Sequence, residues 1–279
     1  MEKVIFWENI FFIIAFTLYI LSAIYYFYYF LSANKKIGVS AMYIGVAGLF
    51  SHTLAILLRT IEAGRMPLSN QFEFANVFVW GIVLCYLFLE VRYKLRYQIF
   101  GVFVMPLALI VMGYALTLNR EILPLMPALQ SWWLTFHVGT AIFAYGSFTI
   151  ACGVAIMYLY RANKEENNKM NFITSRFPRL AILDDFIYKT VAFGFLFQTL
   201  VIITGAVWAE QAWGRYWGWD PKETWSLITW FIYAVYLHAR FTRGWAGKKS
   251  AWFAVIGFIC VLFTYIGVNI LLPGLHSYV

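Results

Sequence analysis

The stretch QIFGVFVMPLALIVMGYALT, residues 98–117, decides the fold, because it contains no charged side chain from end to end. A helix of this length rises about 30 Å, which matches the hydrocarbon core of a bilayer. Similar apolar runs recur on both sides of it, separated by short polar connections. The whole chain of 279 residues is 62% hydrophobic and only 12% charged, which excludes an ordinary soluble domain with a polar surface.

The apolar runs predict an all-α, polytopic membrane protein with about eight transmembrane helices. Helices satisfy their own backbone hydrogen bonds in lipid, and the runs lack the alternation of a β-barrel. No cleavable signal peptide is expected, since the first run is too long and lacks a basic start. We expect one membrane domain over residues 1–279. The expected spans are residues 4–31, 39–60, 75–91, 98–117, 135–160, 187–208, 223–240 and 250–272.

The distribution of basic residues predicts the orientation. Of the 21 Lys and Arg residues, most fall on one set of alternate connections. That side is expected to be cytoplasmic, which places both termini outside. The net charge of +8 therefore needs no nucleic-acid partner, and the basic residues lack the clustering of a nucleic-acid site. The longest inner connection, residues 161–186, is polar and predicts a surface loop with one short helix.

The cysteines exclude one class of function. Cys85, Cys152 and Cys260 fall inside apolar runs, and none belongs to a CxxC pair. The chain is therefore not expected to be a thiol oxidoreductase, and these side chains are expected to pack between helices.

An outer loop over residues 208–225 is unusually rich in tryptophan. An interfacial aromatic belt explains such enrichment, but a belt needs neither interspersed glycines nor an ordered acid and base. The segment WGRYWGWDPKETW, residues 213–225, is more typical of a platform for a flat apolar ligand, with glycines that permit close backbone approach. Pro221 is placed to begin a helix, with Asp220 as its N-cap and Glu223 in its first turn. The tryptophans are Trp208, Trp213, Trp217, Trp219 and Trp225, and the glycines are Gly214 and Gly218.

This segment resembles the tryptophan-rich WWD signature of the haem-handling proteins of cytochrome c maturation. Within that superfamily the chain is similar to the CcsA type of System II, also called ResC, over roughly residues 40–279. The resemblance implies a membrane protein that binds and exports haem b and works with a CcsB-type (ResB-type) membrane partner. Together they are expected to attach haem through thioether bonds to the CxxCH motif of apocytochrome c, as a holocytochrome c synthase. The expected location is the bacterial inner membrane or the plastid thylakoid membrane, with the site on the outer or lumenal side.

The chain has four histidines, and three are expected to bind haem iron. His137, in WLTFHVG, and His276, in LPGLHSY, both fall at the outer side, so they can approach one iron from opposite faces. The resemblance assigns them as the external haem ligands. His238, in YLHAR, lies near the inner end of its helix, where the family places a transmembrane haem ligand opposed by one from the partner. His52 matches no family ligand, and a helix-packing or supporting role is favoured for it.

Basic groups at the outer face are candidate partners for the haem propionates, because arginine can bind a carboxylate with two hydrogen bonds. Snorkelling at a helix end explains Arg59, and phospholipid contact is the simpler interpretation of the others. Arg215 and Lys222 are preferred because they lie within the signature. Asp220 is expected to cap a helix or orient a histidine more than to act as an acid. The remaining outer candidates are Arg65 and Arg120.

The predicted catalysis depends mainly on positioning, since the substrate brings its own thiols. The predicted catalytic group comprises Trp213, Trp217, Trp219 and Asp220, and the haem-binding group comprises His137, His276, His238, Trp208, Gly214, Gly218, Arg215 and Lys222. A haem exporter or chaperone without ligation activity is the main alternative. A haem b electron carrier is less favoured, because it needs matched histidine ligands on facing helices and His52 and His238 are poorly matched. A non-haem channel or scaffold is the remaining possibility.

Overall fold

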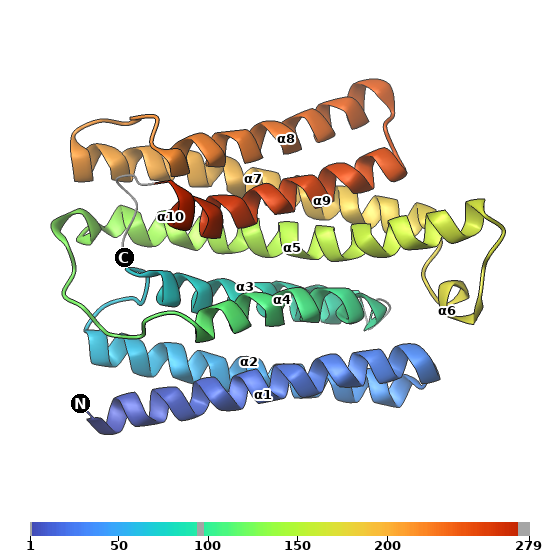
Figure 1. The fold of residues 1–279 in the computed structure, drawn as a ribbon, viewed down its shortest axis with the longest axis horizontal. Helices are drawn as coiled ribbons and strands as arrows, with labels where there is room; N and C mark the ends of the chain where they lie inside the picture. The colour runs from blue at the N-terminus through green and yellow to red at the C-terminus, as the bar shows by residue number, and fades with distance from the viewer. Residues whose placement is uncertain (1, 94–97, 273–279) are drawn as a thin grey trace. The chain divides into compact units, whose positions relative to one another are not determined.

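The computed structural model describes residues 2–93 and 98–272, and it is helical apart from short connections (Figure 1). Seven helices in this part of the chain are long and apolar enough to cross a membrane. The prediction of an all-α polytopic membrane protein is therefore confirmed. The chain divides into two compact units, residues 1–122 and 123–279, called unit 1 and unit 2 below.

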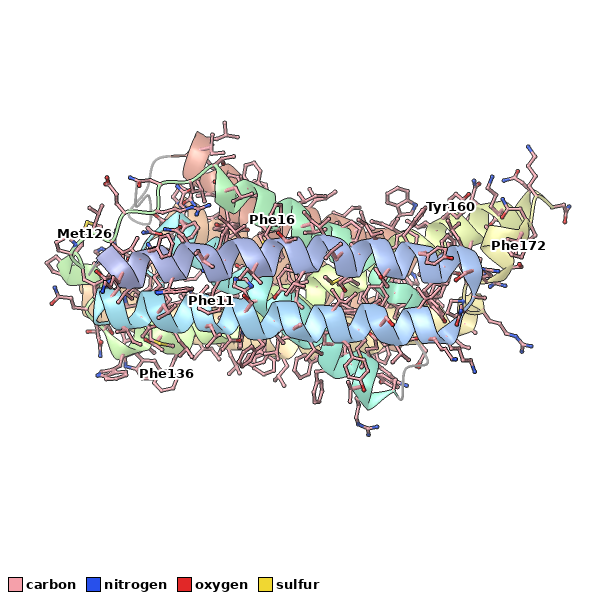
Figure 2. All side chains as sticks on the ribbon, turned by 90° about the horizontal axis from the view of Figure 1, so that it is seen from below. Phe11, Phe16, Met126, Phe136, Tyr160 and Phe172 are labelled. Carbon is pink, nitrogen blue, oxygen red and sulfur yellow. The ribbon has the colours of Figure 1, made fainter. Side chains whose placement is uncertain are left out.

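Unit 1 contains four long helices. Helices α1 and α2 lie side by side as an antiparallel pair (Figures 1 and 2). Two serine hydroxyls donate across this pair, Ser22 to the carbonyl of Ala41 and Ser51 to that of Phe11. Small hydroxyl-bearing residues of this kind let membrane helices approach closely. The helices are α1 (Glu2–Ser32), α2 (Lys35–Ala63), α3 (Gln71–Arg92) and α4 (Gly101–Leu116), with the short η1 (Gln98–Phe100) before α4.

Unit 2 is built around α5 (Trp132–Glu166) and α7 (Leu180–Trp213), which pack along much of their length. Helices α8 (Pro221–Arg243) and α9 (Lys248–Leu262) complete the bundle, and Phe148 of α5 stacks on Tyr233 of α8 at 3.8 Å. The end of unit 2 that holds the start of α5 is the one predicted to face outward, and it is called the outer end. The short elements are η2 (Pro127–Leu129), α6 (Phe172–Ser175), η3 (Phe263–Gly267, a π-helix) and α10 (Val268–Leu271).

The two ends of unit 2 are distinguished by the elements that lie there. Met126 and Phe136 lie at the outer end, and Tyr160 and Phe172 lie at the opposite end (Figure 2). The connection predicted over residues 161–186 is shorter in the structure, because α5 continues to Glu166 and α7 already begins at Leu180, with α6 between them. The single short helix predicted there is confirmed.

The predicted span over residues 223–240 forms α8, but α8 is less apolar than the seven membrane-spanning candidates. Its polar groups find partners inside unit 2. Ser226 accepts a hydrogen bond from Gln198 of α7 at 2.9 Å, and Trp230 donates to Thr199 of α7 at 2.9 Å. Polar side chains in a membrane bundle are stable when neighbouring helices satisfy them in this way.

Candidate functional site

The start of α5 is fixed against the end of α7 at the outer end of unit 2. Ser131 is the N-cap of α5, and its hydroxyl accepts from the backbone N–H of Trp133 at 3.1 Å. The same hydroxyl donates to the side-chain oxygen of Gln211 on α7 at 2.8 Å. The first turns of α5, which carry His137, are therefore held beside α7.

The ring of His137 is oriented by a backbone group of α7. Its Nδ1 lies 3.0 Å from the carbonyl oxygen of Val201. A carbonyl oxygen only accepts, so Nδ1 carries the hydrogen, and Nε2 of the neutral ring holds the lone pair. Histidines that bind metals commonly donate their other N–H to a carbonyl in this way. The half-buried His137 thus has the chemistry of an iron ligand at Nε2.

Trp208 lies directly against His137. The two rings stack at 5.8 Å with an interplanar angle of 23°, and Trp208 is only 2% exposed. Its indole N–H donates to the carbonyl of Ala128 at 2.9 Å, and Trp213 packs edge-on against it at 5.0 Å. The structure therefore places Trp208 where it supports His137, while its own ring is covered by protein.

The tryptophan-rich loop begins where α7 ends. Gly214 adopts the left-handed conformation (φ 70°) at the C-cap, and its N–H donates to Glu210 at 2.7 Å. The guanidinium of Arg215 packs over Gly218, where an added Cβ would lie 2.8 Å from it. Trp217 and Trp219 meet edge to face at 5.8 Å, and Trp219 is 69% exposed. The loop thus presents the aromatic ring of Trp219 and the cationic side chain of Arg215 at the surface of unit 2.

A capping box fixes the other end of this loop to α8. The carboxylate of Glu223 accepts from the N–H groups of Gly218 at 2.8 Å and Asp220 at 3.1 Å. Asp220 caps the helix and accepts from the N–H of Lys222 at 2.9 Å. The predicted cap and helix start at Pro221 are confirmed. Because the Asp220 carboxylate binds helix amides, its expected role as a cap is favoured over that of an acid.

Lys222 is half-buried just before the span predicted over residues 223–240. Burial lowers its pKa from 10.5 to about 8, although the nearby Asp220 carboxylate opposes this shift. Opposite charges attract more strongly where water is partly excluded, so an anionic ligand beside the half-buried Lys222 would favour its charged form.

His238 lies far from His137 within unit 2. It is exposed on α8, about 25 Å along the helix from Pro221. Two residues later, Arg240 forms an ion pair with the buried Asp184 of α7 at 2.8 Å, and Asp184 also accepts from the N–H of Gly247 at 2.8 Å. These contacts hold the inner end of α8 in place. The structure thus separates His238 from the outer histidine, as predicted.

His276, the other predicted outer ligand, lies outside the described residues. The last described helix, α10, runs toward the outer end of unit 2 (Figure 1), and the described residues end at Leu272. The π-helical turn before α10 packs Phe263 against Trp225 of α8 at 4.2 Å. Single π-helical turns are frequent at functional sites. The ligand role of His276 stays a prediction.

His52 is buried in unit 1, with both ring nitrogens in hydrogen bonds. Nε2 lies 2.5 Å from the side-chain oxygen of Asn76 on α3, and Nδ1 lies 3.2 Å from the hydroxyl of Tyr19 on α1. This arrangement agrees with the favoured helix-packing role.

The expectation that Arg59 snorkels at a helix end is wrong. Its side chain is 1% exposed and pairs with Glu8 at 3.0 Å and Glu73 at 3.1 Å. Arg65 pairs with the same Glu73 at 2.9 Å, and the carbonyl of Arg120 accepts from Arg59 at 3.0 Å. Carboxylates from α1 and α3 neutralise the charge inside unit 1, so Arg59 is a poor candidate for a propionate partner.

The cysteines are unpaired, and burial of Cys152 agrees with the expected packing role. Within the described part of the chain, no group of three or more His, Cys, Asp or Glu side chains is arranged to hold a metal ion.

These features define a class of protein: a polytopic helical membrane protein with a histidine and a tryptophan-rich loop at one end of a helical unit. The family model described as cytochrome C assembly protein matches residues 68–276. The chain belongs to this cytochrome c assembly family and is of the CcsA type, so it has a role in cytochrome c maturation.

Relatives and one solved structure give the extent of the similarity. A cytochrome c biogenesis protein CcsA from Guillardia theta is 40% identical over 267 residues, which covers 88% of each chain. The protein of that name from Prochlorococcus marinus is 38% identical over 264 residues, covering 84% of this chain and 83% of the relative. The solved structure of cytochrome c heme lyase CcmF matches the fold with a TM-score of 0.70 at 16% identity. That match covers 92% of this chain and 46% of CcmF, so this chain spans about half of its length.

Proposed function

We propose that the outer end of unit 2 binds haem b as a substrate, with His137 and His276 as axial ligands. The observation that carries this proposal is the Nδ1–H hydrogen bond to Val201, which leaves the lone pair of His137 on Nε2. The exposed Trp219 offers an apolar face for a flat ring. Arg215 and Lys222 supply cations for the propionates, Gly214 allows close backbone approach, and Gly218 leaves room for the guanidinium of Arg215.

The proposed reaction is thioether formation on the CxxCH motif of apocytochrome c. Each cysteine thiol adds across one haem vinyl group: the sulfur bonds to the carbon next to the ring, and the thiol hydrogen ends on the terminal carbon. No group leaves, and the addition is redox-neutral. The protein therefore contributes position, through the histidines and the loop that carries Trp213, Trp217, Trp219 and Asp220. The histidine of CxxCH replaces one axial ligand, which releases the product.

This activity is proposed to need a CcsB-type membrane partner. The exposure of His238 supports this proposal, because a histidine on the outside of a membrane helix is costly unless it has a partner. We propose that His238 ligates haem on its way outward, opposite a ligand from the partner. The site then faces the outside of a bacterial inner membrane or the lumen of a thylakoid.

Coexpression with the partner and a CxxCH reporter separates a synthase from its main alternative. A synthase produces reporter that keeps its haem after denaturing electrophoresis. An exporter or chaperone delivers haem, but the reporter loses it on denaturation. The haem b electron carrier is disfavoured by His52, because both of its ring nitrogens are engaged within unit 1.

A further inference from the structure

Gly205 of α7 faces the ring of His137 at very short range. A Cβ built on Gly205 would lie 2.9 Å from both Nδ1 and Cε1 of that ring, closer than real Cβ atoms come. The same Cβ would lie 3.8 Å from Nε2, so the Nδ1–Cε1 edge of the ring faces Gly205 and Nε2 lies farther from it. The imidazole thus occupies the space that any side chain at position 205 would take.

The neighbouring turns of α7 complete the contact. Val201, four residues before Gly205, supplies the carbonyl that accepts from Nδ1 at 3.0 Å. Trp208, three residues after Gly205, stacks on the ring at 5.8 Å. Residues spaced by three and four lie on one helix face, so Val201, Gly205 and Trp208 form one continuous contact surface for the imidazole.

We propose that Gly205 and the Val201 carbonyl are the positioning elements that aim Nε2 of His137 at haem iron. The proposal rests on the proposed function, because it takes His137 as an axial ligand. A methyl group at position 205 forces the ring off α7 and breaks the Nδ1–H bond to Val201. This change alters both the direction of Nε2 and its basicity, since the hydrogen bond on the far nitrogen strengthens a histidine ligand.

A double-mutant cycle without haem tests the contact itself. Gly205→Ala is expected to lower the thermal midpoint of the purified protein in the wild-type background but not in the His137→Ala background. Gly139→Ala on α5 is the matched control, because a Cβ there meets nothing within 4 Å. An equal loss in both backgrounds would show that the strain does not involve His137 and would overturn the proposal. If Gly205→Ala fails to fold, recovery in the double variant supports the proposal and persistent misfolding contradicts it.

Haem binding tests the positioning role. Relative to wild type and Gly139→Ala, Gly205→Ala is expected to retain haem about 10-fold more weakly. The haem that remains is expected to have a more positive midpoint potential, because its imidazole has lost the hydrogen bond to Val201. Unchanged affinity and potential in Gly205→Ala would refute the positioning role even if the stability cycle shows coupling. Absence of haem from the wild type would instead refute the proposed function, while the stability cycle would still report on the contact.

Discussion

The Nδ1 of His137 lies 3.0 Å from the carbonyl oxygen of Val201, so a backbone atom of α7 sets the orientation of a side chain on α5. Two helices that are far apart in sequence thereby define one potential ligand atom. The stability of this arrangement depends on the elements that hold α5, α7 and the tryptophan-rich loop together.

Glu223→Ala is expected to loosen the tryptophan-rich loop. The substitution leaves the N–H groups of Gly218 and Asp220 without their acceptor, at a cost of about 2 kcal/mol. Near-ultraviolet circular dichroism should report a changed environment for Trp217 and Trp219, together with a lower thermal midpoint. Glu121→Ala, at an exposed position in the connection after α4, is the control and should leave both signals unchanged. Equal spectra for the two variants would contradict the anchoring role of Glu223.

Asp184→Asn is expected to release the inner end of α8. It breaks the ion pair with Arg240 and weakens the bond to Gly247, which together should cost about 2 kcal/mol. The haem signal that depends on His238 should fall, while the signal that depends on His137 persists. The adjacent Asp185→Asn is the control, because the ion pair of Asp185 with Lys189 lies on an exposed surface. A loss confined to the His137-dependent signal would count against this account.

Two buried glutamates of α3 are expected to respond in opposite ways to neutralisation. Glu73→Gln removes one of the two carboxylates that pair with Arg59 and also breaks the ion pair with Arg65. Glu8 alone then faces the buried charge of Arg59, so the substitution is expected to cost about 3 kcal/mol. Glu90 has no cation within ion-pair distance among the described residues, and it accepts from Tyr26 at 2.5 Å. Glu90→Gln keeps an acceptor there, so the thermal midpoint should stay the same or rise. A large fall in Glu90→Gln would show that Glu90 acts as a paired charge.

Lys222 is expected to make stability depend on pH in the alkaline range. Its pKa is about 8 in the folded protein and 10.5 without burial, so unfolding takes up a proton between these values. The free energy of unfolding should therefore rise with pH across this interval, because the unfolded state binds more protons there. The comparison is with Lys222→Met, which should lack this part of the pH dependence. Parallel curves for the two proteins would rule out the lowered pKa.

Much of the fold was predictable because a segment that crosses lipid must be a long apolar helix, and such a segment is recognisable from its own residues alone. The charge-free run 98–117 corresponds closely to η1 and α4, which end at Leu116. The cap at Asp220 was also predictable, since Asp-Pro with Glu223 in the first turn specifies a helix start through neighbouring residues alone.

The contacts that were missed are those between distant parts of the chain. The expectation for Arg59 failed because its partners Glu8 and Glu73 lie on other helices. Glu8, an isolated carboxylate in an apolar run, was the one signal that a cation lies close to it in the membrane. Val201 carried no signal, because its contribution is a backbone carbonyl that every residue has. Gly205 carried only a weak signal, since a glycine inside a helix indicates close packing but does not identify the neighbouring group.

The most direct test of the central claim is the absorption spectrum of the purified protein with its partner, oxidised and then reduced with dithionite. The wild type should show haem bands, and His137→Ala and His276→Ala should each weaken them. The double variant should lose no more than either single variant, because both histidines serve one iron, whereas His238→Ala should reduce a separate part of the signal. A wild-type protein that carries no haem and takes up none when haem is added would contradict the account.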